Sequence, residues 1–299
     1  MKQFLFIILF ILQLFFNNNT IYAMNDTILL KSESDLKGDI ISFKDNVYSA
    51  RNLGGKIENK NFISSNEYKI INDTILIVTS KIPGTINNYF YNSFNKLSEI
   101  ITNSTSDGSI KEKHIIYYDT SNKYPKLKLK YNSNKKLQDS IIITFNKDKK
   151  ELQETSYSTK NGNVLYTIVK RFNDNGQIDK KVRTTNESNI RFLYKYDSIN
   201  KKIIDEQWFL NNKIVQKIKY IYNDKAKIIK QIEYDEEKIR HQLEYTYDPI
   251  YGVLLEIISK EHITKYKYNF DNNGNWIVRY EFYDGFPVKI TERKIEYKK

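Results

Sequence analysis

The residues that most often carry acid–base, nucleophilic or metal chemistry are sparse in this sequence. Its 299 residues include three histidines, His114, His241 and His262, and no cysteine. No two histidines stand at the His-x-x-x-His or His-Glu-x-x-His spacing that places two zinc ligands on one side of a helix. With no cysteine and only scattered histidines, a nucleophilic triad would have to be assembled across strands, and no motif points to one. We therefore predict no catalytic residue, no metal site and no cofactor.

Two acidic stretches could supply chemistry of their own. The Asp-Glu-Glu run at 235–237 could offer the paired carboxyls of a glycoside hydrolase, but Lys230 and Lys238 flank it in a predicted turn, which is typical of a solvated loop. The segment from Asp271 to Asn275 is similar to a calcium loop, but its glycine comes two positions early and no glutamate closes it. A hydrolase is therefore the least favoured of the functions considered.

Aromatic side chains are the feature with the greatest potential for ligand binding. The sequence has 24 Tyr, 16 Phe and 2 Trp. Tyr266, Tyr268, Trp276 and Tyr280 form rows on the predicted strands near the C-terminus, and such rings can stack on sugars. The alternative is structural, because Tyr is favoured in strands, where it covers a half-buried face and keeps its hydroxyl in water.

A degenerate repeat would position these side chains. Among the pairs of an aromatic residue followed by Asp or Asn, eight are evenly spaced, at successive steps of 27, 27, 27, 24, 26, 25 and 23 residues. We call the aromatic residues of these pairs the anchors, and expect them to be structural. They are Tyr91, Tyr118, Phe145, Phe172, Tyr196, Tyr222, Tyr247 and Phe270. So even a spacing indicates one supersecondary unit repeated along the chain.

Turn signals divide each repeat into two strands. Gly- or Asn-containing pairs follow the anchors and recur about midway to the next anchor, as at Asn161-Gly162 and Asp284-Gly285. Each repeat then holds a β-hairpin with strands of about eight to ten residues, whose apolar and polar residues alternate. In the strand that begins near residue 276, strict alternation places Trp276 and Tyr280 on one face and Arg279 on the other.

These signals predict an all-β fold. We expect an antiparallel meander of repeated β-hairpins that forms one long twisted or curled sheet. About fifteen to eighteen strands exceed what an open twisted sheet usually holds, so a trough or partial barrel is expected. Residues 24–85 form an N-terminal arm and the opening strands, and residues 86–299 form the hairpin repeats. The terminal strands would be edges open to self-association.

The first residues indicate export. Residues 1–23 combine Lys2, an apolar run from Phe4 to Phe16 and a small residue, Ala23, which is typical of a cleaved signal peptide. The run is too short for a spanning helix, so no transmembrane segment is expected after cleavage. The signal peptide predicts a periplasmic or extracellular protein. Because a lipoprotein needs a cysteine at the cleavage site and the sequence has none, we do not expect a lipoprotein. Lysines spread over most strands account for the net charge of +12 without a nucleic-acid partner.

The anchor and its turn resemble the RHS or YD repeat, whose pattern is Tyr-x-Tyr-Asp-x-x-Gly. The matching stretches begin at Tyr194, Tyr220, Tyr245 and Tyr268. Together with the segment at 35–40 and the ending at 290–293, they are similar to secreted repeat proteins of Bacteroidetes. The resemblance implies a ribbon of hairpins. Large members of the family enclose a toxin, but this chain has few repeats and no toxin domain, so encapsulation is not expected.

Four stretches read Asp-Ser/Thr-Ile, which is similar to the O-glycosylation pattern of secreted Bacteroidetes proteins. The hydroxyl residues are Thr27, Thr74, Ser140 and Ser198, and we expect them on the surface.

The function that we predict is that of an exported, non-enzymatic β-repeat protein. Its extended sheet surface would bind a protein or the cell envelope, with a partner that is a protein or an envelope glycan. The alternative is a carbohydrate-binding module that uses exposed aromatic rows. A contiguous exposed row of three or more rings would favour the second function.

Overall fold

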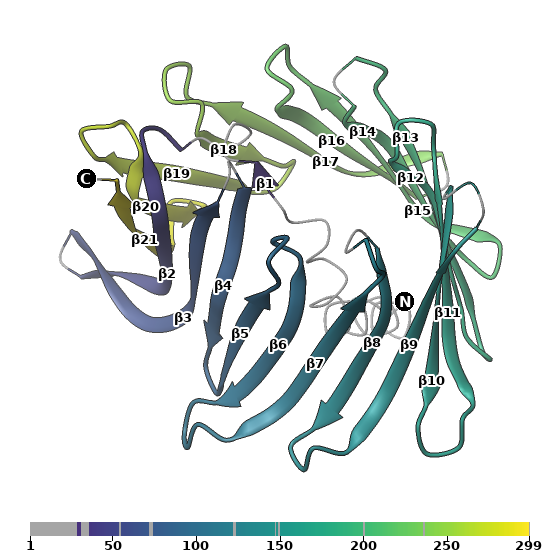
Figure 1. Cartoon of the computed structure of the whole chain (residues 1–299). Coiled ribbons are helices and arrows are strands. Elements are labelled where there is room, and N and C mark those ends of the chain that lie inside the picture. The colour runs from purple at the N-terminus through teal and green to yellow at the C-terminus, as the bar shows by residue number, and fades with distance from the viewer. Residues whose placement is uncertain are drawn as a thin grey trace.

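The computed structural model of the chain describes residues 29–30, 36–53, 55–71, 74–121, 124–146, 148, 150–199, 201–235 and 237–298. The predicted signal peptide, residues 1–23, lies outside the described residues. The described residues form 21 strands (Figure 1). Among them, none belongs to a helix with the length and hydropathy to cross a membrane.

The strands follow the chain in order. They are β1 (Leu29–Leu30), β2 (Ile40–Leu53), β3 (Lys56–Ile71), β4 (Thr74–Ile82), β5 (Thr85–Tyr91), β6 (Leu97–Ser104), β7 (Ile110–Tyr118), β8 (Pro125–Asn132), β9 (Leu137–Phe145), β10 (Glu151–Ser158), β11 (Val164–Phe172), β12 (Ile178–Thr184), β13 (Asn189–Tyr196), β14 (Ile203–Leu210), β15 (Lys213–Tyr222), β16 (Ile228–Asp235), β17 (Lys238–Tyr247), β18 (Leu254–Ile258), β19 (Ile263–Phe270), β20 (Trp276–Tyr283) and β21 (Phe286–Tyr297).

These strands form a closed antiparallel barrel. From β2 to β21, each strand pairs with the next along the chain, and β21 pairs back onto β2, so that 20 strands complete a ring (Figure 1). The remaining strand, β1, is not part of the ring. It pairs with β4, with Leu29 opposite Ile75. The all-β, antiparallel prediction is confirmed.

The prediction of an open trough or partial barrel is wrong. In the structure, β2 runs alongside β21 from Ile40, opposite Tyr297, to Ser49, opposite Lys289. The two strands expected to be free edges therefore satisfy each other's backbone groups, and a closed ring is the arrangement that removes sheet edges altogether. The pairing joins the two ends of the chain, where neither the repeat nor its turns specify a partner.

Each repeat contributes one hairpin and ends at its anchor. All eight anchors are the last residues of odd-numbered strands, from Tyr91 in β5 to Phe270 in β19. The turns that follow them therefore lie together at one end of the barrel, which we call the anchor end. The turns midway between anchors lie at the opposite end, which we call the hairpin end. The prediction of two strands per repeat is confirmed.

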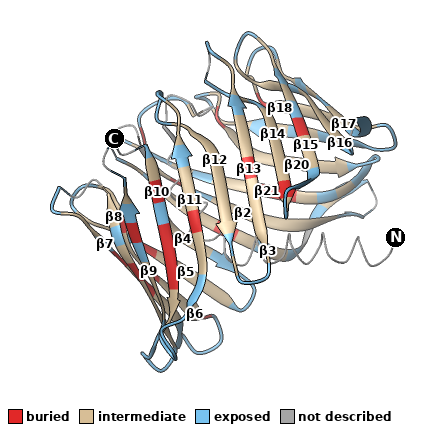
Figure 2. Cartoon of the chain, turned by 90° about the vertical axis from the view of Figure 1, so that its right-hand side faces the viewer, coloured by how far each residue is buried: buried red, intermediate tan, exposed pale blue. Residues whose placement is uncertain are grey.

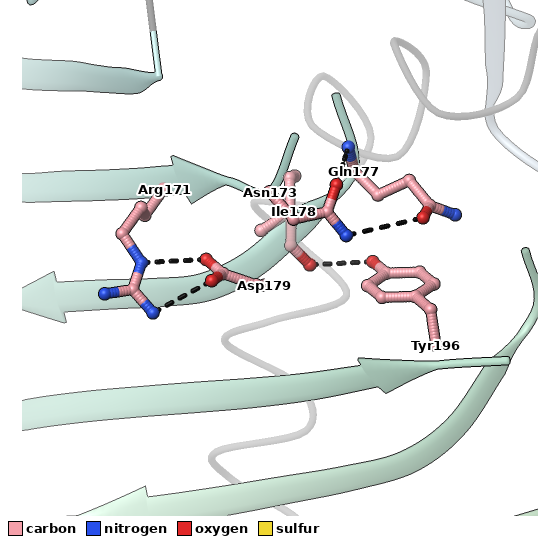
Figure 3. Close-up of polar contacts among 6 residues, drawn as sticks. All are labelled: Arg171, Asn173, Gln177, Ile178, Asp179 and Tyr196. Atoms are coloured by element: carbon pink, nitrogen blue, oxygen red, sulfur yellow. Dashed lines mark hydrogen bonds and ion pairs between the residues drawn. The ribbon is translucent and has the colours of Figure 1, made fainter. Parts of the chain in front are cut away.

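The Asn or Asp after the anchor shapes its turn. The Asn173 Oδ1 atom accepts a hydrogen bond from the backbone N–H of Asn175 at 3.0 Å. It accepts a second one from the backbone N–H of Gln177 at 2.9 Å (Figure 3). Gly176 in the same turn has a φ of 76°, a value that costs a residue with a side chain more than it costs glycine. Equivalent bonds form at Asn92, Asn223 and Asp271, so the turn chemistry expected from the sequence is present.

The anchor tyrosines tie successive hairpins together. The Tyr196 hydroxyl donates a hydrogen bond of 2.7 Å to the carbonyl of Ile178, the residue paired with the preceding anchor, Phe172 (Figure 3). In the same way, Tyr222 donates to the carbonyl of Ile203, the partner of Tyr196. Tyr118 and Tyr247 make the equivalent bond, and Tyr91, the first anchor, donates to the carbonyl of Ile77, the partner of Tyr68. We call these bonds the anchor bonds.

The barrel wall has two distinct faces. Residues opposite one another in paired strands share a face, and interior and exterior positions alternate along each strand. Following the pairings, one face holds most of the buried side chains, including Ile100, Ile116, Ile168, Phe192 and Ile218. Side chains crowd together on the concave side of a barrel, so this face is the inner one. Buried stretches gather around β8 to β11 (Figure 2).

Candidate functional site

Three of the four aromatic residues proposed for ligand stacking lie on the inner wall. Tyr266 and Tyr268 alternate with the outward Lys267 in β19, and Trp276 meets the Tyr268 ring edge to face, with centroids 6.3 Å apart. Tyr280 is opposite Lys267 and therefore points outward. The structure thus brings Tyr266, Tyr268 and Trp276 together and separates Tyr280 from them.

A β-bulge causes this separation. Phe270 pairs with Trp276, but the neighbouring Asn269 pairs with Val278, so one extra residue, Ile277, lies between them. The extra residue reverses the alternation after Trp276 and turns Arg279 inward and Tyr280 outward. The prediction that Trp276 and Tyr280 share a face is therefore wrong. A register shift occurs beside seven of the eight anchors, so this feature belongs to the repeat.

Trp276 lies in a cluster of rings and cations where the barrel closes. The Arg293 guanidinium carbon is 3.6 Å from the centre of the Trp276 ring and 4.7 Å from that of Phe43. Arg293 also binds both carboxylate oxygens of Asp45, each at 2.7 Å. A bidentate, half-buried ion pair stacked on aromatic rings is a stabilising arrangement. One face of Trp276 is thus already occupied by a residue that joins β21 to β2.

A second set of aromatic residues continues along the inner wall from β14 to β19. The Trp208 indole N–H donates to Glu206 at 2.5 Å, and the Tyr220 hydroxyl donates to the same carboxylate at 3.2 Å. Farther along, the Tyr245 hydroxyl donates to Gln231 at 3.2 Å. With Tyr266, these residues form a row that we call the aromatic belt. The belt consists of Trp208, Tyr220, Tyr245 and Tyr266, with Glu206 and Gln231 as its polar partners.

The electrostatics of the belt follow from burial and from its carboxylates. Burial and the neighbouring Glu206 raise the pKa of Tyr220. Burial raises the pKa of Tyr245, and burial and Glu281 raise that of Tyr266 in spite of the opposing charge of Arg279. The phenols are therefore neutral and able to donate hydrogen bonds at physiological pH.

Half-buried rings beside carboxylate and amide groups suit a ligand that has both apolar faces and hydroxyl groups. All four belt residues have intermediate exposure. The exposed aromatic residues of the described chain, which include Phe90, Tyr117 and Phe286, lie outside the belt. The belt is thus a continuous but half-buried row, unlike the exposed row expected of a flat carbohydrate-binding surface. Sequence analysis missed Trp208, Tyr220 and Tyr245, although Tyr220 and Tyr245 share a signal, since each stands two residues before an anchor.

The residues considered for catalysis occupy unrelated places. His114 is buried on the inner wall against Glu112, whereas His262 is exposed and contacts Asp284 at 2.7 Å rather than its neighbour Glu261. Asp235 and Glu237 are exposed at the turn after β16. Within the part of the chain that the structure describes, no group of three His, Asp or Glu residues is placed to hold a metal ion.

The loop at 271–275 uses its side chains to hold the barrel together. Asp271 accepts hydrogen bonds from the backbone N–H of Asn273 and Asn275, and its second carboxylate oxygen contacts the Tyr297 hydroxyl. The Asn275 amide bonds both the N–H and the carbonyl of Lys37, at 2.6 and 2.8 Å. These partners occupy the oxygen atoms that a calcium ion would need.

Charged side chains are buried on the inner wall of β8 to β11. Glu154 lies between two lysines, with Lys170 Nζ at 3.1 Å and Lys128 Nζ at 3.8 Å from its carboxylate oxygens. Only 4 % of the Lys128 side chain and 3 % of the Glu154 side chain are exposed. Burial lowers the pKa of Lys128, and Glu154 opposes this effect. Breaking a buried ion pair leaves an unpaired buried charge, which is costly, so we assign these three residues a structural role in the wall.

The residues proposed for O-glycosylation have different surroundings. Ser198 is exposed in the turn after β13, and Ser140 has intermediate exposure within β9. Thr74 begins β4, and Thr27 lies outside the described residues. Modification at these residues stays a prediction.

The fold and its wall define a closed 20-strand antiparallel barrel that is built from hairpin repeats and lined by aromatic and charged side chains. No protein-family model matches the sequence, and no curated protein matches it. The similarity to RHS or YD repeats therefore stays a prediction.

Several solved structures align with the chain at low similarity. A porin-like protein from Bacteroides uniformis aligns over 87 % of this chain and 98 % of its own, with 11 % identity and a TM-score of 0.41. A porin-like protein from Bacteroides vulgatus covers the same shares, with 9 % identity and a TM-score of 0.25. The structure of TcdB2-TccC3-Cdc42 aligns over 82 % of this chain and 14 % of that one, with 9 % identity and a TM-score of 0.35. Because these TM-scores are all below 0.5, the fold is assigned from the strand pairing of this chain and not from these similarities.

Proposed function

We propose that the protein is an exported, non-enzymatic binding protein that holds a saccharide against the inner wall of its barrel. The aromatic belt carries this proposal. Its rings provide apolar surface for the C–H faces of a sugar, and Glu206 and Gln231 provide acceptors for sugar hydroxyls at the same height of the wall. The signal peptide predicted from residues 1–23 supports export.

The outer wall supports a barrel that stands in water. Lys217 and Lys219 in β15, and Lys265 and Lys267 in β19, point outward in the middle of their strands. A lysine in the middle of the lipid-facing surface of a membrane barrel costs about 2–4 kcal/mol. Four of them on two strands of the same wall would oppose insertion in a bilayer, so we infer a water-exposed outer surface within the periplasm or outside the cell.

Glycan binding by belt variants tests the proposal. The protein is presented to a glycan library at about 0.15 M and about 0.5 M salt, because binding by charge alone is lost at the higher value. We expect salt-resistant binding of a defined glycan, weakened at least roughly tenfold by Tyr245→Ala, since a stacked ring with a hydrogen bond contributes more than about 1.4 kcal/mol. The control is Tyr280→Ala, which removes an outward ring. Equal binding by both variants would contradict the proposal.

Protein binding on the outer wall is the second candidate. On β7 and β9, Tyr117 and Ile142 are exposed by 47 % and 46 %, and both are opposite Leu127 of β8. This row supports a protein partner better than a sugar, because the Tyr117 hydroxyl is the one polar side-chain group among its three residues. Retention of a protein from the periplasm or the medium that is lost in Ile142→Lys, and kept in Tyr245→Ala, would favour this candidate.

A further inference from the structure

A pocket opens at the hairpin end of the barrel, among the turns after β10, β12 and β14. Its volume is about 700 Å³, within the range typical of pockets for small ligands. Its lining includes Asn161, Arg183, Thr185, Glu187, Ile190 and Leu210. We call it the rim pocket. None of the belt residues lines it.

Turn hydrogen bonds hold the polar rim of this pocket in place. The Thr185 hydroxyl oxygen accepts from the N–H of Ser188 at 3.0 Å, and Asn161 accepts from the N–H of Asn163 at 3.2 Å. Asn211 accepts from the N–H of Asn189 at 2.9 Å, which links the second and third turns. Two turns with internal bonds and a third that is bonded to its neighbour form a preorganised rim, and preorganisation reduces the entropy that binding costs.

The floor of the rim pocket is basic and apolar. Arg183 is half-buried, and its guanidinium carbon lies 4.9 Å from the centre of the Tyr166 ring. Ile190 is directly opposite Arg183, and Leu210 is opposite Ile190, so the three residues form one row across the inner wall. Lys181 lies two residues before Arg183 on the same face and adds positive potential below the pocket. A stacked, half-buried guanidinium is the group that best recognises a carboxylate.

We propose that the rim pocket binds an acidic saccharide. The carboxylate of a hexuronate-like sugar would pair with Arg183, the sugar ring would lie on Ile190 and Leu210, and its hydroxyls would bond the amide and hydroxyl groups of the turns. Glu187 supplies a carboxylate to the lining and lies exposed in the turn after β12. Its charge opposes an anionic ligand, so its removal has the opposite effect to that of removing Arg183.

This site is separate from the aromatic belt. The rim pocket is at the hairpin end of β10 to β15, whereas the belt extends along the wall to β19. The two proposals therefore fail independently. Loss of binding in Tyr245→Ala tests the belt, and loss of binding in Arg183→Gln tests the rim pocket.

Titration calorimetry with two matched probes tests the proposal. The probes are a trigalacturonate and the neutral galactose trimer, added to the full chain at about 0.15 M salt. We expect trigalacturonate to bind and the neutral trimer to bind at least roughly tenfold more weakly. A charge-assisted hydrogen bond contributes about 1.5–3 kcal/mol, so Arg183→Gln should weaken trigalacturonate binding roughly 10- to 100-fold. The matched control is Arg51→Gln, which removes an exposed arginine from the hairpin of β2 and β3.

A second variant keeps the test independent of folding. Glu187→Gln should bind trigalacturonate roughly two- to fivefold more tightly, because it removes a like charge near the carboxylate. A gain of affinity cannot come from partial unfolding. Equal binding of the two probes, no binding of trigalacturonate, or an Arg183→Gln variant as tight as Arg51→Gln would each overturn the proposal.

Discussion

Asn275 is the residue whose replacement should open the barrel. It is 1 % exposed, and its side chain bonds the backbone of Lys37 twice and the Tyr297 hydroxyl once, at 2.8 Å. It thereby ties the last anchor turn to the segment before β2 and to the end of β21. Asn275→Ala removes all three hydrogen bonds. At about 1 kcal/mol for each bond, the free energy of unfolding should fall by about 3 kcal/mol.

Urea unfolding followed by tryptophan fluorescence measures this loss, and hydrogen exchange locates it. We expect the amides of β2 and β21 to exchange faster in Asn275→Ala, while those of β7 and β8 stay protected. The matched control is Lys136→Ala, at the equivalent position of an exposed turn, where the change should stay within about 0.5 kcal/mol. A loss in Asn275→Ala of less than about 1 kcal/mol, or uniform exchange around the ring, would refute this account of closure.

Three further predictions concern the wall and the turns. Burial opposes the ionisation of Glu112, but His114 and Lys130 outweigh it and lower its pKa from 4.5 to about 2. Its contribution to stability is therefore present above pH 4.5 and lost as the pH falls toward 2, and Glu112→Gln should flatten this part of an acid-unfolding curve. Ala226 has a φ of 55°, a conformation that is strained for alanine and not for glycine. Ala226→Gly should therefore raise the free energy of unfolding, measured in urea, by about 0.5–1 kcal/mol, and a decrease would show that Ala226 is not strained. Tyr222→Phe removes one anchor bond and should lower the free energy of unfolding by about 1 kcal/mol in the same assay. The comparison is Phe172→Leu, which changes an anchor that has no hydroxyl and so removes no anchor bond.

Most of the hairpin architecture could be predicted from the sequence, because it is local. The Asx bonds of Asn173 and the positive φ of Gly176 involve residues within one turn, and residue types report such geometry directly. The strands on either side are long enough for alternation to show which residues share a face. For this reason the eight anchors, the two strands per repeat and the antiparallel order all follow from the printed sequence.

Two features could not be predicted, for different physical reasons. Closure depends on contacts such as Arg293 with Asp45, 248 residues apart, and no repeat encodes which strand the last one meets. The outward position of Tyr280 could not be predicted, because a bulge beside the anchor Phe270 shifts the alternation by one residue. Strict alternation then assigns Tyr280 and Arg279 to the wrong faces, although each residue type is compatible with either face.

The anchor explains why this sheet bends inward far enough to close. The bulge beside seven of the eight anchors bends the strand and increases the local twist. On the inner side, the hydroxyl of one anchor reaches the carbonyl opposite the preceding anchor, as Tyr222 does at Ile203 and Tyr247 at Ile228. These bonds draw neighbouring hairpins together at their inner surface and leave the outer surface unconstrained. A sheet held in this way along one face curves toward that face, and the curvature is repeated at each of the five tyrosine anchors. The pattern that marks the hairpins in the sequence therefore also curves the sheet, and the contacts of Asn275 and Arg293 fix the strand pairing that closes the ring.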